Sequence, residues 1–304
     1  MDDEAANAQH RIVVGVDGSP GSDHALRWAL EEAAVRDGSV VAVHAWAPPT
    51  KYSSIADLVE PDEVGPHAAA ATEVAEAAVA KAMADLGLKV DVEATAVRGY
   101  VPDVLMRTAA EVGAALLVVG TRGRGGFRGL LLGSVSQQCA SHAPCPVAVV
   151  PERAPLPDGD DVLVGIDGSP QARRALDWAI DEAACRNARL TVAQAWYTPV
   201  PVPPAGLVIT PVDPDLFREA AEEELSTASD EALAAARRRP PDVNLVAVEQ
   251  PAPVALLNQA KDANLLVVGA RGRGGFAGLL LGSVSQQCIH HSPCAVVVVP
   301  QPTS

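Results

Sequence analysis

The chain has 304 residues and a formal net charge of −15, and 48% of its residues are hydrophobic. This length suggests about two domains, each with enough apolar residues for a core. The acidic balance argues against nucleic-acid polymers and anionic membranes as partners, although local arginines could still hold a mononucleotide. Residues 1–5 lack the apolar stretch of a secretory signal, and no apolar run is long enough to span a bilayer. Because five cysteines do not suggest a disulfide framework, we expect a soluble cytoplasmic protein.

The first half alternates short apolar runs with segments of helical period. The predicted strands cover residues 11–16, 39–46, 90–97, 115–119 and 146–150. The first predicted helix follows the first strand and ends near residue 36, and the others cover residues 67–86, 102–111 and 135–142. Ser19 or Ser22 can cap the first helix, and the Pro-containing residues 48–66 read as a connection. Right-handed crossovers would then place helices on both faces of a parallel sheet.

The second half repeats the first. Residues 162–170 (VLVGIDGSP) match residues 12–20 (IVVGVDGSP) at an offset of 150, which indicates a tandem duplication. We therefore predict two tandem, doubly wound α/β domains, at residues 10–151 and 161–300. A polar, Pro-rich linker at residues 152–160 joins them.

A glycine-rich segment follows the fourth strand of each half, at residues 120–134 and 269–283, with the spacing Gly-x2-Gly-x9-Gly-Ser. Glycines expose backbone N–H groups, and the N-terminus of the next helix favours an anion, so the segment is typical of a phosphate cradle. It is neither a Walker A loop nor a dinucleotide fingerprint. A simple long turn is the plain alternative, but it would not need arginines. The two copies of the segment together contribute four arginines that could bind phosphate, namely Arg122, Arg124, Arg271 and Arg273.

Two features of the neighbourhood qualify this prediction. Asp17 and Asp167 end the first strand of each half, where an acid either caps the next helix or faces the ligand crevice at the strand ends; we favour the crevice. Arg128 has Ala277 as its counterpart, so we expect the second site to hold phosphate less tightly.

These motifs resemble the universal stress protein family, specifically its tandem-domain members, over almost the whole chain. The resemblance implies a five-stranded parallel sheet of order 3-2-1-4-5 in each half. It implies that the loop holds the ribose and phosphates of ATP, that the first strand lines the adenosine end, and that the end of the second strand meets adenine. In the first half the implied binding residues are Gly15, Val16, Asp17, Ala45, Gly120, Arg122, Gly123, Arg124, Gly125, Gly126, Gly133, Ser134, Val135 and Ser136. In the second half they are Gly165, Ile166, Asp167, Ala195, Gly269, Arg271, Gly272, Arg273, Gly274, Gly275, Gly282, Ser283, Val284 and Ser285.

The implied function is that of a stress-response regulator or sensor with two ATP sites, which acts through ATP-dependent conformation or partner binding. ATP is the expected cofactor, with Mg²⁺ as an optional companion. No general base, catalytic lysine or two-carboxylate metal site stands out, so we expect slow hydrolysis or none and, at most, a weak ATPase. The alternative is an ATP-using enzyme, an ATPase or adenylating type of related fold. Its Ser-Gly-Gly-x-Asp-Ser-like loop would replace the Val-Asp-Gly-Ser-Pro found here. A non-nucleotide interaction module is disfavoured by the duplicated glycine motif.

The last strand of each half, at residues 147–150 and 296–299, is apolar and lies at a predicted sheet edge. We expect the two halves to pair through these strands, and whole chains to form a homodimer.

Cysteine and tryptophan complete the candidate set. Cys139-x2-His142-x2-Cys145 and its repeat, Cys288-x2-His291-x2-Cys294, offer three zinc ligands where a structural site needs four, so packing is the favoured interpretation. Trp28 and Trp178 are expected to pack or to lie at an interface, and Trp46 and Trp196 to pack or form a lid near the adenine end. The acidic helix at residues 215–238 is expected to present a solvated face.

Overall fold

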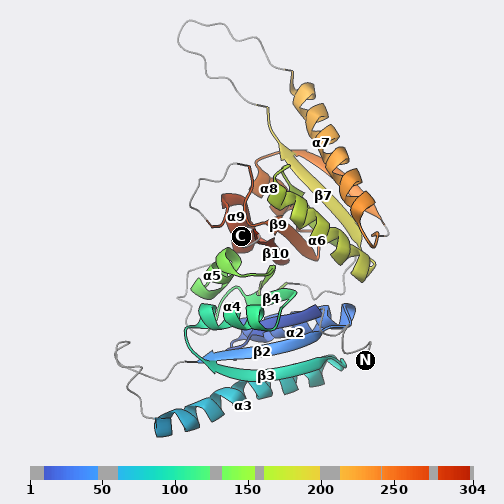
Figure 1. Cartoon of the computed structure of the whole chain (residues 1–304). Coiled ribbons are helices and arrows are strands. Elements are labelled where there is room, and N and C mark those ends of the chain that lie inside the picture. The colour runs from blue at the N-terminus through green and yellow to red at the C-terminus, as the bar shows by residue number, and fades with distance from the viewer. Residues whose placement is uncertain are drawn as a thin grey trace, which may run out of the picture.

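The structure, a computed structural model, describes residues 10–46, 61–123, 132–154, 161–198, 213–240, 242–273 and 280–301, with the backbone alone described at residues 61–66. Within these residues, ten strands form one sheet in the order β3-β2-β1-β4-β5-β10-β9-β6-β7-β8 (Figure 1). Each half therefore has the order 3-2-1-4-5, with all its neighbouring strands parallel, which confirms the predicted fold.

The elements of the two halves follow one plan. The strands are β1 (Arg11–Gly15), β2 (Ser39–Trp46), β3 (Asp91–Arg98), β4 (Leu116–Gly120), β5 (Val147–Val150), β6 (Asp161–Ile166), β7 (Arg189–Trp196), β8 (Val243–Glu249), β9 (Leu265–Gly269) and β10 (Ala295–Val299). The helices are α2 (Pro20–Val35), α3 (Pro61–Leu86), α4 (Val101–Glu111), α5 (Ser134–His142), α6 (Pro170–Arg186), α7 (Pro214–Ala235), α8 (Ala252–Gln259) and α9 (Ser283–His291).

Capping fixes the start of the first helix in each half. The Ser19 hydroxyl accepts a hydrogen bond from the Ser22 N–H at 3.2 Å, and Pro20 occupies the first turn. Ser169 repeats this cap by accepting from the Ala172 N–H at 3.2 Å. The cap is therefore Ser19 and not Ser22, and it starts the helix directly beyond the carboxyl end of β1.

Helix α3 begins at Pro61, six residues before the predicted start at residue 67. The prediction was wrong because Pro66 read as part of the connection. Pro61 suits a helix start, since its fixed φ is already helical and its missing N–H would have no intrahelical partner. Pro66 costs one donor within the helix, but the Ala-rich continuation favours helix strongly enough to tolerate that loss.

The core lies on both faces of the sheet. One layer packs β-strand side chains against α2, α3, α6 and α7, and the other packs them against α4, α5, α8 and α9. The central strands are buried on both faces, as continuous apolar runs in parallel sheets are. No helix among the described residues is long and apolar enough to cross a membrane.

The two halves meet at β5 and β10. These strands run antiparallel, with Val149 opposite Val296 and Val147 opposite Val298. Each strand would be an edge strand in its own half, so their pairing removes two apolar edges from solvent. It also brings charged side chains of α2 and α6 into contact across the seam.

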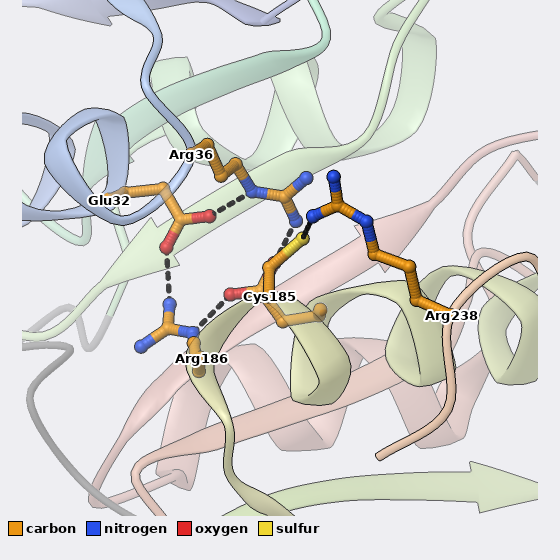
Figure 2. Close-up of polar contacts among 6 residues, drawn as sticks. Glu32, Arg36, Cys185, Arg186 and Arg238 are labelled. Carbon is orange, nitrogen blue, oxygen red and sulfur yellow. Dashed lines mark hydrogen bonds and ion pairs between the residues drawn. The ribbon is translucent and has the colours of Figure 1, made fainter.

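A closed ring of four charges occupies that seam (Figure 2). Glu32 of α2 contacts Arg36, the C-cap residue of that helix, at 2.5 Å and also contacts Arg186. Glu182 contacts both Arg186 and Arg36. The two glutamates are 0% exposed and the Arg186 side chain is 3% exposed. Each buried carboxylate thus faces one guanidinium from its own half and one from the other half, so no charge in the ring is left uncompensated.

Two tryptophans flank the ring. The Arg36 guanidinium lies over the Trp178 ring at 5.3 Å, and the Arg186 guanidinium lies over the Trp28 ring at 5.9 Å. Both contacts cross from one half to the other, and both have cation–π geometry. These tryptophans therefore pack at the interface between the halves. Beside the ring, Arg238 donates a hydrogen bond to the Cys185 sulfur at 3.5 Å (Figure 2).

Candidate functional site: paired cavities at the strand ends

A cavity of about 540 Å³ opens at the carboxyl ends of β1 and β4. One end is apolar, where Val43, Ala45 and Leu105 form the wall. The other end is formed by the loop glycines together with Arg122 and Ser134. An apolar slot beside a polar, glycine-lined end suits a ligand with one flat apolar part and one anionic part.

A second cavity, of about 420 Å³, lies at the carboxyl ends of β6 and β9. Leu256 and Ala252 of α8 provide its apolar wall, and Arg271 and Ser283 lie at its loop end. The two cavities thus occupy equivalent places in the two halves. They lie where the strand order reverses, which is where open α/β sheets bind their ligands.

The acid at the end of the first strand touches the glycine loop in both halves. A Cβ added to Gly123 would collide with Asp17 Oδ2, and one added to Gly272 would collide with Asp167 Oδ2. Asp167 Oδ2 also accepts a hydrogen bond from the Arg273 N–H at 2.8 Å. A side chain at either glycine would therefore displace the carboxylate that lies directly against the loop backbone.

Asp17 also accepts a hydrogen bond from the Ser19 N–H at 2.9 Å, through its other oxygen. This contact is a local turn ahead of α2, whose cap is Ser19. The aspartate therefore shapes the start of the helix and lines the cavity at once. Sequence reasoning had treated these two roles as alternatives.

The helix after the loop points its N-terminus into each cavity. Helix α5 begins at Ser134, and its N-cap, Gly133, provides no side-chain hydrogen bond to the first turn; Gly282 and Ser283 repeat this arrangement at α9. Because no N-cap side chain bonds to the N–H groups of the first turn, these groups favour an anionic ligand.

Buried serines brace the loop from behind. The Ser136 hydroxyl lies 3.2 Å from the Thr121 carbonyl and 3.0 Å from the Gly133 carbonyl, as donor. The Ser285 hydroxyl donates to the Gly269 carbonyl at 2.7 Å. Although these serines line the cavities, their protons are used to hold the two ends of the loop together.

Most of the predicted site residues that the structure describes gather at these two cavities. The first cavity is lined by Gly15, Val16, Asp17, Ala45, Gly120, Arg122, Gly123, Gly133, Ser134, Val135 and Ser136 from that set. The second is lined by Gly165, Ile166, Asp167, Gly269, Arg271, Gly272, Arg273, Gly282, Ser283, Val284 and Ser285. Predictions for Arg124, Gly125, Gly126, Arg128, Gly274, Gly275 and Ala277 lie outside the described residues.

Ala195 differs from its counterpart Ala45. No β7 residue is among those that line the second cavity, whereas Val43 and Ala45 of β2 line the first. The smaller second cavity stops short of β7. Sequence reasoning also missed the aliphatic wall from α4 and α8. Leu105 and Leu256, one on each helix, approach Gly15 and Gly165 closely, and their apolar helical spacing was the available signal.

The cysteines near the sites belong to the core. Cys139 and Cys145 are buried, and burial raises the pKa of each thiol to about 12. Burial likewise raises the pKa of Cys288 to about 12. His142 is exposed and bonds to the Gln138 carbonyl at 3.1 Å. Among the residues that the structure describes, no group of three or more His, Cys, Asp or Glu side chains could hold a metal ion.

Comparison with known proteins agrees with the fold and with the duplication. The profile of the universal stress protein family matches residues 9–151 and again residues 160–300. A universal stress protein of Mycobacterium tuberculosis is 38% identical over 307 residues, which cover 96% of this chain and 98% of that protein. Another, from Mycolicibacterium smegmatis, is 36% identical over 310 residues, covering 96% and 97%.

A solved universal stress protein from Archaeoglobus fulgidus shares the fold. It superposes with a TM-score of 0.62 at 22% identity, and the alignment covers 95% of this chain and 98% of that chain. The two matched domains and the relatives aligned over almost their whole length support the same conclusion. The chain belongs to the universal stress protein family and contains two of its domains in tandem.

Proposed function

We propose that the chain is an ATP-binding stress-response regulator or sensor with one nucleotide site in each half. The observation that carries the proposal is the pair of cavities, each with an apolar wall, a glycine loop and a helix N-terminus. Their volumes, about 540 and 420 Å³, fall in the range of about 300–1,000 Å³ typical of small-molecule sites.

In this proposal the adenine occupies the apolar end of the first cavity, between Ala45 and Leu105. The phosphates lie against the N–H groups at the start of α5, near Arg122. Asp17 holds the loop in position from behind. The second site works in the same way, with Leu256 and Arg271 in the matching places.

Binding is proposed to matter more than turnover. The carboxylates Asp17 and Asp167 lie against the loop backbone and are occupied in shaping it. Neither the buried thiols nor the inward-bonded serines are free to act as a general base. Bound ATP would instead favour one arrangement of the cytoplasmic protein that a partner or a second chain recognises. The domain limits that fit this reading are residues 10–151 and 161–300, with a linker at 152–160.

The test is to purify the chain without added nucleotide, denature it, and identify the released molecules by mass spectrometry. We expect ATP or ADP, and binding of added ATP by the stripped protein in calorimetry. Titration with AMP and cAMP on the same protein identifies the preferred nucleotide. Absence of both retained nucleotide and ATP binding would contradict the proposal. Rapid ATP turnover, on the scale of about 1–100 s⁻¹ found in kinases, would favour the enzymatic alternative.

A further inference from the structure

Beside the second cavity lies a carboxylate that the first half does not repeat. Glu224 of α7 forms an ion pair with the guanidinium of Arg273, the last described residue of the second glycine loop before residues 274–279. Its other oxygen accepts a hydrogen bond from the Gln194 amide at 2.8 Å. Arg273 is one of the arginines expected to bind phosphate. Its charge, however, already has an internal partner in Glu224.

The ion pair draws this guanidinium away from the glycine loop. A Cβ added to Gly168 would collide with Arg273 Nη2 and with Glu224 Oε1, so the pair lies directly across Gly168. Gly168 and Glu224 line a neighbouring hollow of about 490 Å³ between α6 and α7, and neither lines the loop cavity. The Arg273 backbone, in contrast, stays at the loop cavity through its bond to Asp167. The main chain of Arg273 thus lies at the loop cavity, whereas its guanidinium lies beside that cavity.

Gln194 fixes the carboxylate in this place. Its side chain is buried, at 6% exposed, and comes from β7 beneath α7. Its amide nitrogen donates to Glu224, and its carbonyl oxygen has no hydrogen-bond partner among the described residues. A buried donor held in one orientation makes the Glu224 position a built feature and not a chance surface contact.

The first half lacks both of these side chains. Three buried positions of α3 recur 150 residues later on α7: Ala71 and Ala221, Ala75 and Leu225, Ala82 and Ala232. In this register Val74 stands where Glu224 stands, and His44 stands where Gln194 stands. His44 bonds instead to the Val16 carbonyl, at 2.8 Å. The first half therefore places no carboxylate at this position.

We infer that Glu224 is an internal competitor for the phosphates at the second site, and that it makes the two sites unequal. This inference rests on the proposed function. A polyphosphate that enters the second cavity must take Arg273 from Glu224 or bind without it. A neutral ligand such as adenosine does not need the guanidinium, so the carboxylate penalises ligands in proportion to their negative charge.

The size of the effect follows from the exposure of the pair. Arg273 is 58% exposed and Glu224 is 34% exposed, which makes this a partly screened ion pair. Such pairs contribute up to about 1 kcal/mol, so removing the competitor should tighten ATP binding by about fivefold.

The test isolates the second site in the full chain. Val101→Trp fills the first cavity from α4, and in that background Glu224→Val installs the residue of the first half. Glu224→Gln removes the charge but keeps a hydrogen-bonding side chain. Glu223→Val is the matched control, because it removes an exposed carboxylate one position away on the same helix. ATP and adenosine affinities are measured for each by calorimetry, after thermal unfolding has confirmed the fold.

We expect Glu224→Val and Glu224→Gln to tighten ATP binding by about fivefold, with adenosine binding unchanged and Glu223→Val within about twofold of the parent. The gain should vanish when Arg273→Ala is added, because the two residues then have nothing to compete for. Unchanged or weaker ATP binding in both Glu224 variants, or an equal gain in Glu223→Val, would overturn the inference. If ATP binds the first site of the unblocked chain, that result leaves the proposed function standing. If no variant binds ATP at either site, both fail.

Discussion

The two halves of the chain carry nearly the same glycine loop but place it among different charges. On α2 and α3, Asp23 pairs with Lys81 at 3.0 Å; at the equivalent positions of α6 and α7, Arg173 pairs with Glu231 at 3.0 Å. The charges are reversed, yet the pair is kept. At the loop nothing is reversed, because a carboxylate lies against a glycine in both halves. The two halves thus share the same carboxylate–glycine contact at the cavities. On the outer helices they share only the pairing of opposite charges.

The largest expected effect tests the equivalence of the halves at their seam. Glu32→Ala and Glu182→Ala each remove one carboxylate from the buried ring and leave two guanidiniums to share the remaining carboxylate, so one buried positive charge is uncompensated. We expect each to cost about 3–5 kcal/mol of unfolding free energy. Glu111→Ala, which breaks an exposed pair with Arg107, is the control and should cost less than about 1 kcal/mol. Urea unfolding measures all three. Unequal losses at Glu32 and Glu182 would break the two-fold picture of the seam.

The tryptophans at the seam should separate the halves. Trp28 is fully buried, whereas Trp178 is partly exposed. We expect Trp28→Ala to cost about 3–5 kcal/mol and Trp178→Ala about 1–2 kcal/mol, because less apolar area is lost at the second position. Thermal unfolding of the two variants gives the ranking, and a larger loss at Trp178 would contradict it.

The loop glycines should show a smaller difference of the same kind. A side chain at either glycine that begins the loop would press on the backbone of the first helix of its half: a Cβ on Gly120 would lie 2.8 Å from the Gly21 carbonyl oxygen. On Gly269 the nearest atoms, those of Gln171, are 3.0 Å away. We expect each single variant to cost about 1–3 kcal/mol, with Gly120→Ala the worse. Denaturant midpoints of the single variants decide the order.

The reversed surface pairs give the smallest effect. Arg173→Asp should destabilise the second half by about 0.5–1 kcal/mol, since the introduced carboxylate would face both Glu231 and Asp177. Adding Glu231→Lys recreates the pair of the first half and should recover part of the lost stability. A double variant no more stable than the single one would show that opposite charges at these two positions are not what stabilises the contact.

The sequence was sufficient for the fold because its signals are local and occur twice. Apolar runs located the strands within one or two residues, and the resemblance to the family implied their order. Helix α3 was missed at its start because Pro66 resembles a boundary, while the helical context of Pro61 depends on the chain that follows. The β5 and β10 edges were identified by their apolar composition.

The glycine spacing in the sequence indicated residues that line the two cavities. It gave no indication of the contacts between elements that are distant in the sequence. Nothing in the motif shows that Asp17 presses on Gly123, or that Glu224 reaches Arg273. The acidic helix read as a solvated face, yet one of its glutamates is held by a buried glutamine. The charge ring had a faint signal, a Glu–Arg pair at i,i+4 within the apolar stripe of each first helix, but its closure depends on the β5–β10 pairing.

The central claim is that each half holds one nucleotide, and binding stoichiometry tests it most directly. Val101 and Ala252 are the first residues of α4 and α8 and line equivalent walls of the two cavities. Calorimetric titration of stripped protein with ATP should give two sites per chain, one in Val101→Trp, one in Ala252→Trp and none in the double variant. Two sites in either single variant, or ATP binding that survives in the folded double variant, would contradict the account.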